Sequence, residues 1–169
     1  MPDSADISGD NTPEYLSFRK QVKGTNIIEQ TLLATDYLNH FNEIVMLLEM
    51  VPDMPEIIEE AKEWTPKSYT DHFNDSTFTE KDLAVAAYEH VPDRYKLPFE
   101  QTISQIDRLI EAAVKRLDEI DGTADPEYLK VTSTDYSRNI QRLMDFASGI
   151  IHGGSNTMDQ NEIDHLLSD

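Results

Sequence analysis

Residues 99–120 read FEQTISQIDRLIEAAVKRLDEI, and this stretch decides the fold. Apolar side chains recur in it at alternating intervals of four and three residues, over three repeats: Phe99, Ile103, Ile106, Ile110, Ala113, Leu117 and Ile120. This spacing places them along one face of an α-helix, where a second helix can bury them. The stretch therefore predicts a long amphipathic helix, and Asp121-Gly122 is a typical helix end.

A second helix with the same pattern follows at once. Asp125 can cap it, Pro126 suits its first turn, and its apolar positions are Tyr136, Ile140, Leu143, Ala147 and Ile150. The connection has about five residues, which forces the two helices to run antiparallel. We therefore expect a hairpin over residues 99–151, about 33–38 Å long at a rise of about 1.5 Å per residue. A second copy of the chain can equally complete the apolar face, which leaves a homodimer through the hairpin open.

The rest of the chain also follows a helical period, and no stretch alternates between apolar and polar residues as a strand does. We expect helices at 25–50, 55–63 and 83–90, an ordered loop at 65–78, and a largely disordered arm at 1–24. The predicted fold class is all-α, with residues 25–151 forming a helical bundle around the hairpin. What the 65–78 loop recognises is not evident from its residues.

Charge and composition exclude several classes of function. The 169 residues include 33 acidic and 14 basic side chains, for a net charge of −19. This charge argues against nucleic acid and anionic lipid as partners, since both bind through Lys and Arg. The sequence has no cysteine and no apolar run of roughly 18 residues, the length that a membrane span needs. We expect a cytoplasmic protein whose partner presents a basic surface or a cation.

The last residues of the chain form a candidate docking segment. Residues 152–158 contain two glycines and are expected to act as a linker. Residues 159–169 follow with an acidic, amphipathic pattern that is too short for a stable isolated helix, which favours docking into a groove on a partner. A final bundle helix or a frayed tail would explain the same pattern.

The sequence QNEIDHLL at residues 160–167 resembles the peptides by which bacterial chemotaxis proteins bind the response regulator CheY. Such a peptide lies at the N-terminus of the flagellar switch protein FliM and at the C-terminus of the phosphatase CheZ, and here its position is that of CheZ. The resemblance implies a flexible docking helix that contacts a CheY-like receiver domain through these residues: Gln160, Glu162, Ile163, Asp164, Leu166 and Leu167.

A second motif lies on the second hairpin helix. Asp135 and Asn139 are four residues apart, so they project from one face of that helix, beside its apolar seam. The stretch DYSRNIQRLMD at residues 135–145 is similar to the CheZ-like phosphatases, which place an acid and an amide, usually Gln, at this spacing. Here Asn replaces Gln, which shortens the reach by one methylene, and the register after the amide differs by one residue. Gln141 is a possible substitute, but it does not share a face with Asp135.

The resemblance implies a mechanism that needs no cofactor from this chain. A phosphorylated receiver supplies its own acyl phosphate and Mg²⁺, so that Asn139 would orient a water in line with phosphorus and Asp135 would engage a receiver lysine. The chain would then be an aspartyl-phosphate phosphatase.

Two alternatives stay open. A non-catalytic adaptor of signalling or motility would use the tail alone, and a metal- or ligand-binding bundle would centre on Asp36, His40 and Glu43. The di-iron bundles need a Glu-x-x-His motif on each of two helices, and this sequence contains a single one, Glu162–His165 in the tail, so no metal ligands are assigned. The conventional nucleotide-binding and hydrolase motifs are absent as well.

Overall fold

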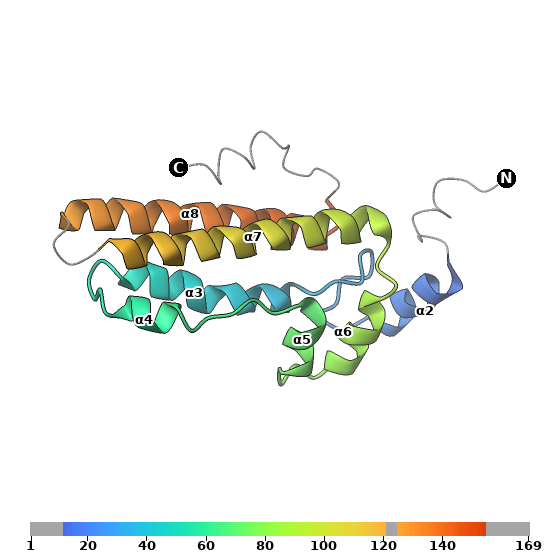
Figure 1. Cartoon of the computed structure of the whole chain (residues 1–169). Coiled ribbons are helices and arrows are strands. Elements are labelled where there is room, and N and C mark those ends of the chain that lie inside the picture. The colour runs from blue at the N-terminus through green and yellow to red at the C-terminus, as the bar shows by residue number, and fades with distance from the viewer. Residues whose placement is uncertain (1–11, 121–124, 155–169) are drawn as a thin grey trace. The chain divides into compact units, whose positions relative to one another are not determined.

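The computed structural model describes residues 12–120 and 125–154, and these residues are all-α, as predicted. The helices are α2 (Pro13–Gln21), the 3-10 helix η1 (Thr35–Leu38), α3 (Asn39–Met50), α4 (Ile57–Ala61), α5 (Tyr69–Asn74), α6 (Lys81–Tyr88), α7 (Asp93–Glu119) and α8 (Pro126–Ile151). Within these residues the sole β-type pairing is an isolated bridge between Ile27 and Ala34. Figure 1 shows α7 and α8 as the two long helices of a hairpin.

The chain divides into two compact units, and α7 and α8 contribute residues to both. In the described part, the first unit holds residues 12–38, 67–101 and 147–154, and the second holds residues 39–66, 102–120 and 125–146. Each unit has its own buried apolar side chains. The candidate site belongs to the second unit.

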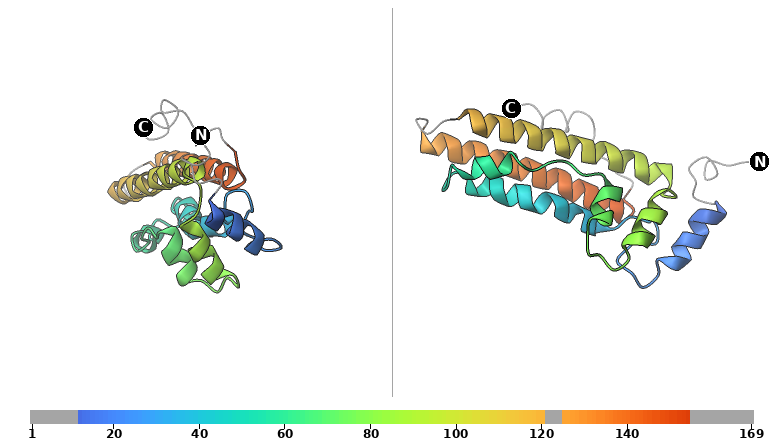
Figure 2. Two further views of the ribbon diagram at one scale, coloured as in Figure 1. Left: turned by 90° about the vertical axis from the view of Figure 1, so that its right-hand side faces the viewer. Right: turned by 60° about the horizontal axis from the view of Figure 1, so that its bottom comes forward.

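The core of the second unit confirms most of the predicted seam. In Figures 1 and 2, α3 runs alongside the paired α7 and α8 segments, and α4 packs against α3. The buried side chains of these helices include Ile44, Leu48, Ile106, Leu109, Ile110, Ala113, Leu117, Ile140 and Leu143. Burial of each large aliphatic side chain contributes about 1.5–3 kcal/mol, so this face holds the unit together. Ile103 and Ile120, the second and the last positions of the predicted seam, are half-buried.

Polar contacts attach α8 to α3 in the same unit. Ser133 and Ser137 are buried. The Ser133 hydroxyl donates to the carbonyl of Leu48, and the Ser137 hydroxyl donates to the Glu49 carboxylate over 2.8 Å. Both serines lie on the α8 face that meets α3, and small side chains permit helices to approach closely. The predicted start of α8 is also confirmed, because the Asp125 carboxylate accepts the backbone N–H of Glu127 at 3.0 Å.

Aromatic side chains form the core of the first unit. Tyr69 lies at its centre, with ring centroids 4.5 Å from Tyr88, 4.8 Å from Phe73 and 5.9 Å from Phe99. Tyr37, Tyr69, Phe73 and Phe99 are buried. The hydroxyl of Tyr69 accepts the backbone N–H of Ala34 over 2.9 Å, and the hydroxyl of Tyr37 donates to the carbonyl of Lys67 over 2.6 Å. These hydrogen bonds satisfy the polar tips, so the aromatic rings serve packing.

The predicted helix over 25–50 is wrong in its first ten residues. Residues 25–34 form a looped segment closed by the Ile27–Ala34 bridge, and the helical part begins only with η1 and α3. Leu32 has φ 64°, a left-handed conformation that an α-helix does not contain. The buried hydroxyl of Thr31 donates to the carbonyl of Ile151 over 2.5 Å. Tertiary hydrogen bonds therefore override the helical period of this segment.

Two further segments that we expected to lack helices contain them. Residues 13–21 of the arm at 1–24 form α2, which is capped by the Thr12 hydroxyl and anchored by buried Tyr15, so the prediction of a largely disordered arm does not hold there. The loop predicted at 65–78 contains α5, whose cap is Ser68. Both helices are short, and their caps rather than their weak periodicity mark where they start.

The two glycines of the linker predicted at 152–158 form the C-terminal cap of α8. The N–H of Gly154 donates to the carbonyl of Gly149, and the N–H of Gly153 donates to that of Ile150. With φ 95° at Gly153, this pattern is a Schellman motif that ends α8. Residues 152–154 of the expected linker are thus a helix cap. Residues 155–169, which include the predicted docking helix, lie outside the described residues.

Candidate functional site

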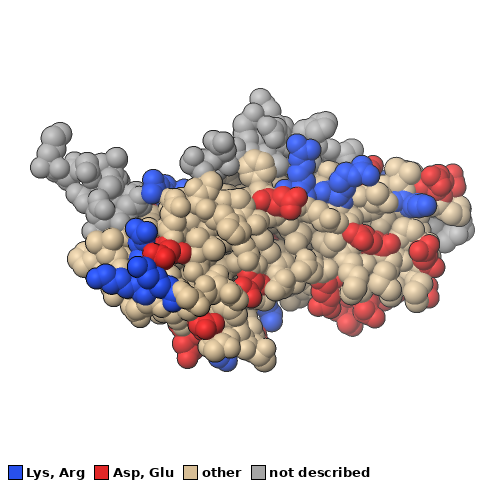
Figure 3. Space-filling model, turned by 180° about the vertical axis from the view of Figure 1, so that it is seen from behind, with Lys and Arg blue, Asp and Glu red and all other residues tan. Residues whose placement is uncertain are grey.

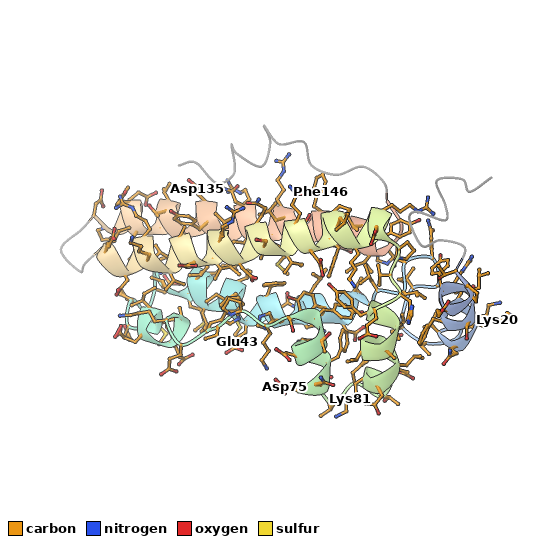
Figure 4. All side chains as sticks on the ribbon, turned by 45° about the vertical axis from the view of Figure 1, so that its right-hand side comes forward. Lys20, Glu43, Asp75, Lys81, Asp135 and Phe146 are labelled. Carbon is orange, nitrogen blue, oxygen red and sulfur yellow. The ribbon has the colours of Figure 1, made fainter. Side chains whose placement is uncertain are left out.

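Asp135 and Asn139 line the same open pocket on the hairpin of the second unit. The pocket has a volume of about 290 Å³. Asp135 is exposed and Asn139 is half-buried. In Figure 4, Asp135 lies on the side of α8 that faces away from α3. Glu43, which is also labelled, lies on α3. The helical spacing from which we predicted a common face therefore agrees with the pocket that the two side chains share.

The other residues of this pocket are two tyrosines, a valine, a threonine and one cation. Its lining is completed by Arg116 of α7 and by these residues of α8: Tyr128, Val131, Thr132 and Tyr136. Tyr128 and Val131 are large hydrophobic side chains that stay 44% and 48% exposed. An exposed apolar rim beside polar groups is typical of a surface that binds another molecule.

Arg116 is held in place by contacts across the hairpin. Its Nη2 donates to the hydroxyl of Tyr128, and its guanidinium carbon lies 5.7 Å from the centroid of that ring. Its Nη1 lies 3.9 Å from a carboxylate oxygen of Glu119. The hydrogen bond to Tyr128 is the main cause that raises the pKa of Arg116, which remains a cation at every physiological pH.

Asp135 forms an ion pair with Arg138, with 3.6 Å between Oδ1 and Nη1. Both side chains are exposed, at 60% and 70%. An ion pair this open to water contributes about 0–1 kcal/mol, so it does not fix the carboxylate rigidly. Asp135 is therefore available to a cation of a binding partner.

A second, larger depression of about 590 Å³ lies on the other side of α8, toward α3. There the Glu49 carboxylate accepts hydrogen bonds from Ser137 at 2.8 Å and from the Gln141 amide at 2.9 Å. Gln141 is thus engaged with Glu49 and lines this depression, so the amide that shares a pocket with Asp135 is Asn139. The space-filling view in Figure 3 shows both basic and acidic side chains at the surface of the molecule seen from behind, and the lining of this depression is likewise mixed, with Arg138, Arg142 and Asp145.

The structure gives no support to the alternative metal site. Among residues 12–120 and 125–154, no group of three or more His, Asp or Glu side chains is arranged to hold a metal ion. The ring of His40 stacks on Trp64 with 4.8 Å between centroids, and Trp64 Nε1 donates to the His40 carbonyl over 3.3 Å. His40 therefore has a packing role in the second unit. In the same described ranges, no helix is long and apolar enough to cross a membrane.

The predicted docking residues lie in the part of the chain that is not described. They are Gln160, Glu162, Ile163, Asp164, Leu166 and Leu167, and their role stays a prediction. Conversely, Arg116 and Tyr128 are site residues that we did not predict from the sequence. The signal was present in the hairpin itself, because antiparallel pairing across a short connection brings the end of α7 next to the start of α8.

Comparison with known proteins identifies no relative. No protein-family model matches the chain, and no curated protein and no solved structure matches it. The function of the protein is therefore inferred from the residues of the site and from the short sequence motifs.

Proposed function

We propose that the protein binds a phosphorylated, CheY-like receiver domain and promotes its dephosphorylation. The observation that carries the proposal is the common pocket of Asp135 and Asn139, an acid and an amide one helical turn apart on an outward face of α8. The exposed side chains of Tyr128 and Val131 beside them offer an apolar contact area for a protein partner. An accessible amide next to an apolar rim suits insertion into the active site of another protein.

The proposed reaction needs no cofactor from this chain. A receiver carries its phosphoryl group on an aspartate, as an acyl phosphate, and binds its own Mg²⁺. The oxygen of a water attacks phosphorus, the bond from phosphorus to the carboxylate oxygen breaks, and the water proton passes to the phosphate or the solvent. Asn139 would hold the water in line by a hydrogen bond, while Asp135 would pair with a lysine of the receiver.

The terminal peptide supports the same partner. Residues 160–167 read QNEIDHLL and resemble CheY-docking peptides. A peptide that is tethered to the site by a short connection raises the effective concentration of its bound receiver to about the millimolar range. Under this proposal the tail recruits the receiver, and the pocket on α8 acts on it.

Phosphate release tests the proposal. A panel of CheY-like receiver domains is phosphorylated with a small phosphodonor, and the decay of the acyl phosphate is followed with and without the protein. We expect faster decay for at least one receiver and loss of the acceleration in Asn139→Ala. Gln141→Ala is the matched control, since it removes an amide two residues away that faces Glu49. No acceleration with any receiver would refute the proposal.

A deletion of residues 158–169 separates recruitment from catalysis. We expect the deletion to weaken binding of the receiver, and a high concentration of the protein to restore the rate of phosphate release. If the tail binds a receiver but neither the full protein nor Asn139→Ala changes its decay, the protein is an adaptor. In that case the motif of the tail is functional and the Asp135–Asn139 pair is not.

A further inference from the structure

We infer that Arg116 is a third functional residue of the Asp135–Asn139 pocket, and that its guanidinium binds the phosphoryl oxygens of the phosphorylated receiver. The inference rests on the proposed function and adds to it a residue that neither motif contains. Arg116 reaches the pocket from α7, whereas the other lining residues belong to α8. The site is therefore a property of the hairpin and not of one helix.

Neighbouring contacts place the guanidinium before any partner arrives. Arg116 directly precedes Leu117, which is buried in the seam, so the backbone at this position is fixed by core packing. The side chain then crosses to α8, where Tyr128 accepts a hydrogen bond from Nη2. A guanidinium has five N–H donors, and the contacts with Tyr128 and Glu119 leave several of them for a ligand. The Arg116 side chain remains 44% exposed, so a ligand has access to it.

Arg116 places a positive charge in a pocket that also holds the carboxylate of Asp135. The chain carries a net charge of −19, and Asp135 adds a negative charge inside the pocket. A phosphorylated aspartate is itself anionic and would be repelled by such a surface. Arg116 is the basic residue among those that line this pocket, while Arg138 is paired with Asp135 and lines the other depression. The guanidinium of Arg116 therefore reduces the repulsion on the surface that would meet the phosphoryl group of the receiver.

The transition state strengthens this interaction. As the bond to the aspartate oxygen breaks, charge spreads over the three equatorial oxygens of the phosphoryl group. The planar fork of a guanidinium can donate two parallel hydrogen bonds to these oxygens, which an ammonium group does not match.

Single-turnover kinetics test the inference, with a receiver that the wild-type protein dephosphorylates. At saturating protein, Arg116→Gln should lower the rate of release on the order of 10²–10³-fold, the loss typical for removal of one transition-state donor. Its affinity for the unphosphorylated receiver should stay within about twofold, because the arginine acts on the phosphoryl group. Arg116→Lys, which keeps the charge without the fork, should lose about tenfold.

The matched control is Arg108→Gln, which removes an exposed arginine from the same helix outside the pocket. It should release phosphate at the wild-type rate. Unchanged rates in both Arg116 variants, with loss in Asn139→Ala, overturn the role of Arg116 and leave the proposed function standing. If the Gln variant unfolds at a lower temperature than wild type, the Lys variant decides, and a full wild-type rate there overturns the inference. A wild-type protein that accelerates no receiver refutes both.

Discussion

Replacement of Asp107 by Asn should stabilise the protein at neutral pH and not at low pH. Asp107 lies on α7 in the second unit and is half-buried, and its Oδ1 is buried without a hydrogen-bond partner. Burial disfavours the charged form and raises the pKa of this carboxyl to about 6. The folded chain therefore holds a proton on Asp107 at pH values where the unfolded chain has released it.

The size of the effect follows from the difference in pKa. A rise from 3.8 to about 6 corresponds to about 3 kcal/mol, at about 1.36 kcal/mol per unit. Because the side chain keeps partial contact with water, screening reduces this to on the order of 1 kcal/mol. Below about pH 4 both states are protonated and the cost vanishes. Stability falls as the pH rises from about 4 to 6, and the full cost is present above that range.

Denaturant unfolding at a series of pH values from 4 to 7.5 measures the prediction. The free energy of unfolding of Asp107→Asn should exceed that of wild type above pH 6, and the gain should shrink toward zero at pH 4. Loss of any negative charge also reduces self-repulsion in this acidic chain, so Asp145→Asn, an exposed change on α8, is the control. A gain equal in both variants, or one independent of pH, would refute the burial argument.

Two stability predictions concern the first unit. Gly153→Ala should lower the free energy of unfolding by about 1–2 kcal/mol, because φ is 95° and the added Cβ would lie 2.6 Å from the Gln30 side chain. Gly149→Ala, within α8, adds a Cβ with no atom within 4 Å and should raise the free energy of unfolding by about 0.5–1 kcal/mol. If both variants change the midpoint of thermal unfolding in the same direction, the assignment of Gly153 to the helix cap is wrong. Thr31→Val should cost about 1–3 kcal/mol, since it leaves the Ile151 carbonyl without its buried donor; an unchanged free energy of unfolding would show that this hydrogen bond adds nothing.

The sequence was informative wherever one face of a helix is buried along its whole length. Most of the α7 seam and the Asp125 cap were predicted correctly, because both depend on local spacing. The start of the first hairpin helix was not predicted, because α7 begins at Asp93, before the predicted start at residue 99, and includes Pro98. A proline at the sixth residue of a helix removes one backbone donor and crowds the carbonyl four residues earlier, and here the neighbouring side chains of Tyr95 and Phe99 are buried.

Long-range hydrogen bonds explain what the sequence did not reveal. The looped conformation of residues 25–34 depends on partners such as Ile151, 120 positions away from Thr31, and no local pattern encodes such a distance. The same limit applies to the site. Asp135 and Asn139 share a helix and were found by spacing, whereas Arg116 joins them only after the hairpin closes.

The ion pair between Asp135 and Arg138 limits what any incoming cation can gain. A lysine that approaches Asp135 substitutes one positive group for another, and this exchange leaves the number of neutralised charges unchanged. The net free energy of such a swap is small at an open surface. Asp135 would thus govern the orientation in which two molecules meet, while the strength of their association would come from other contacts.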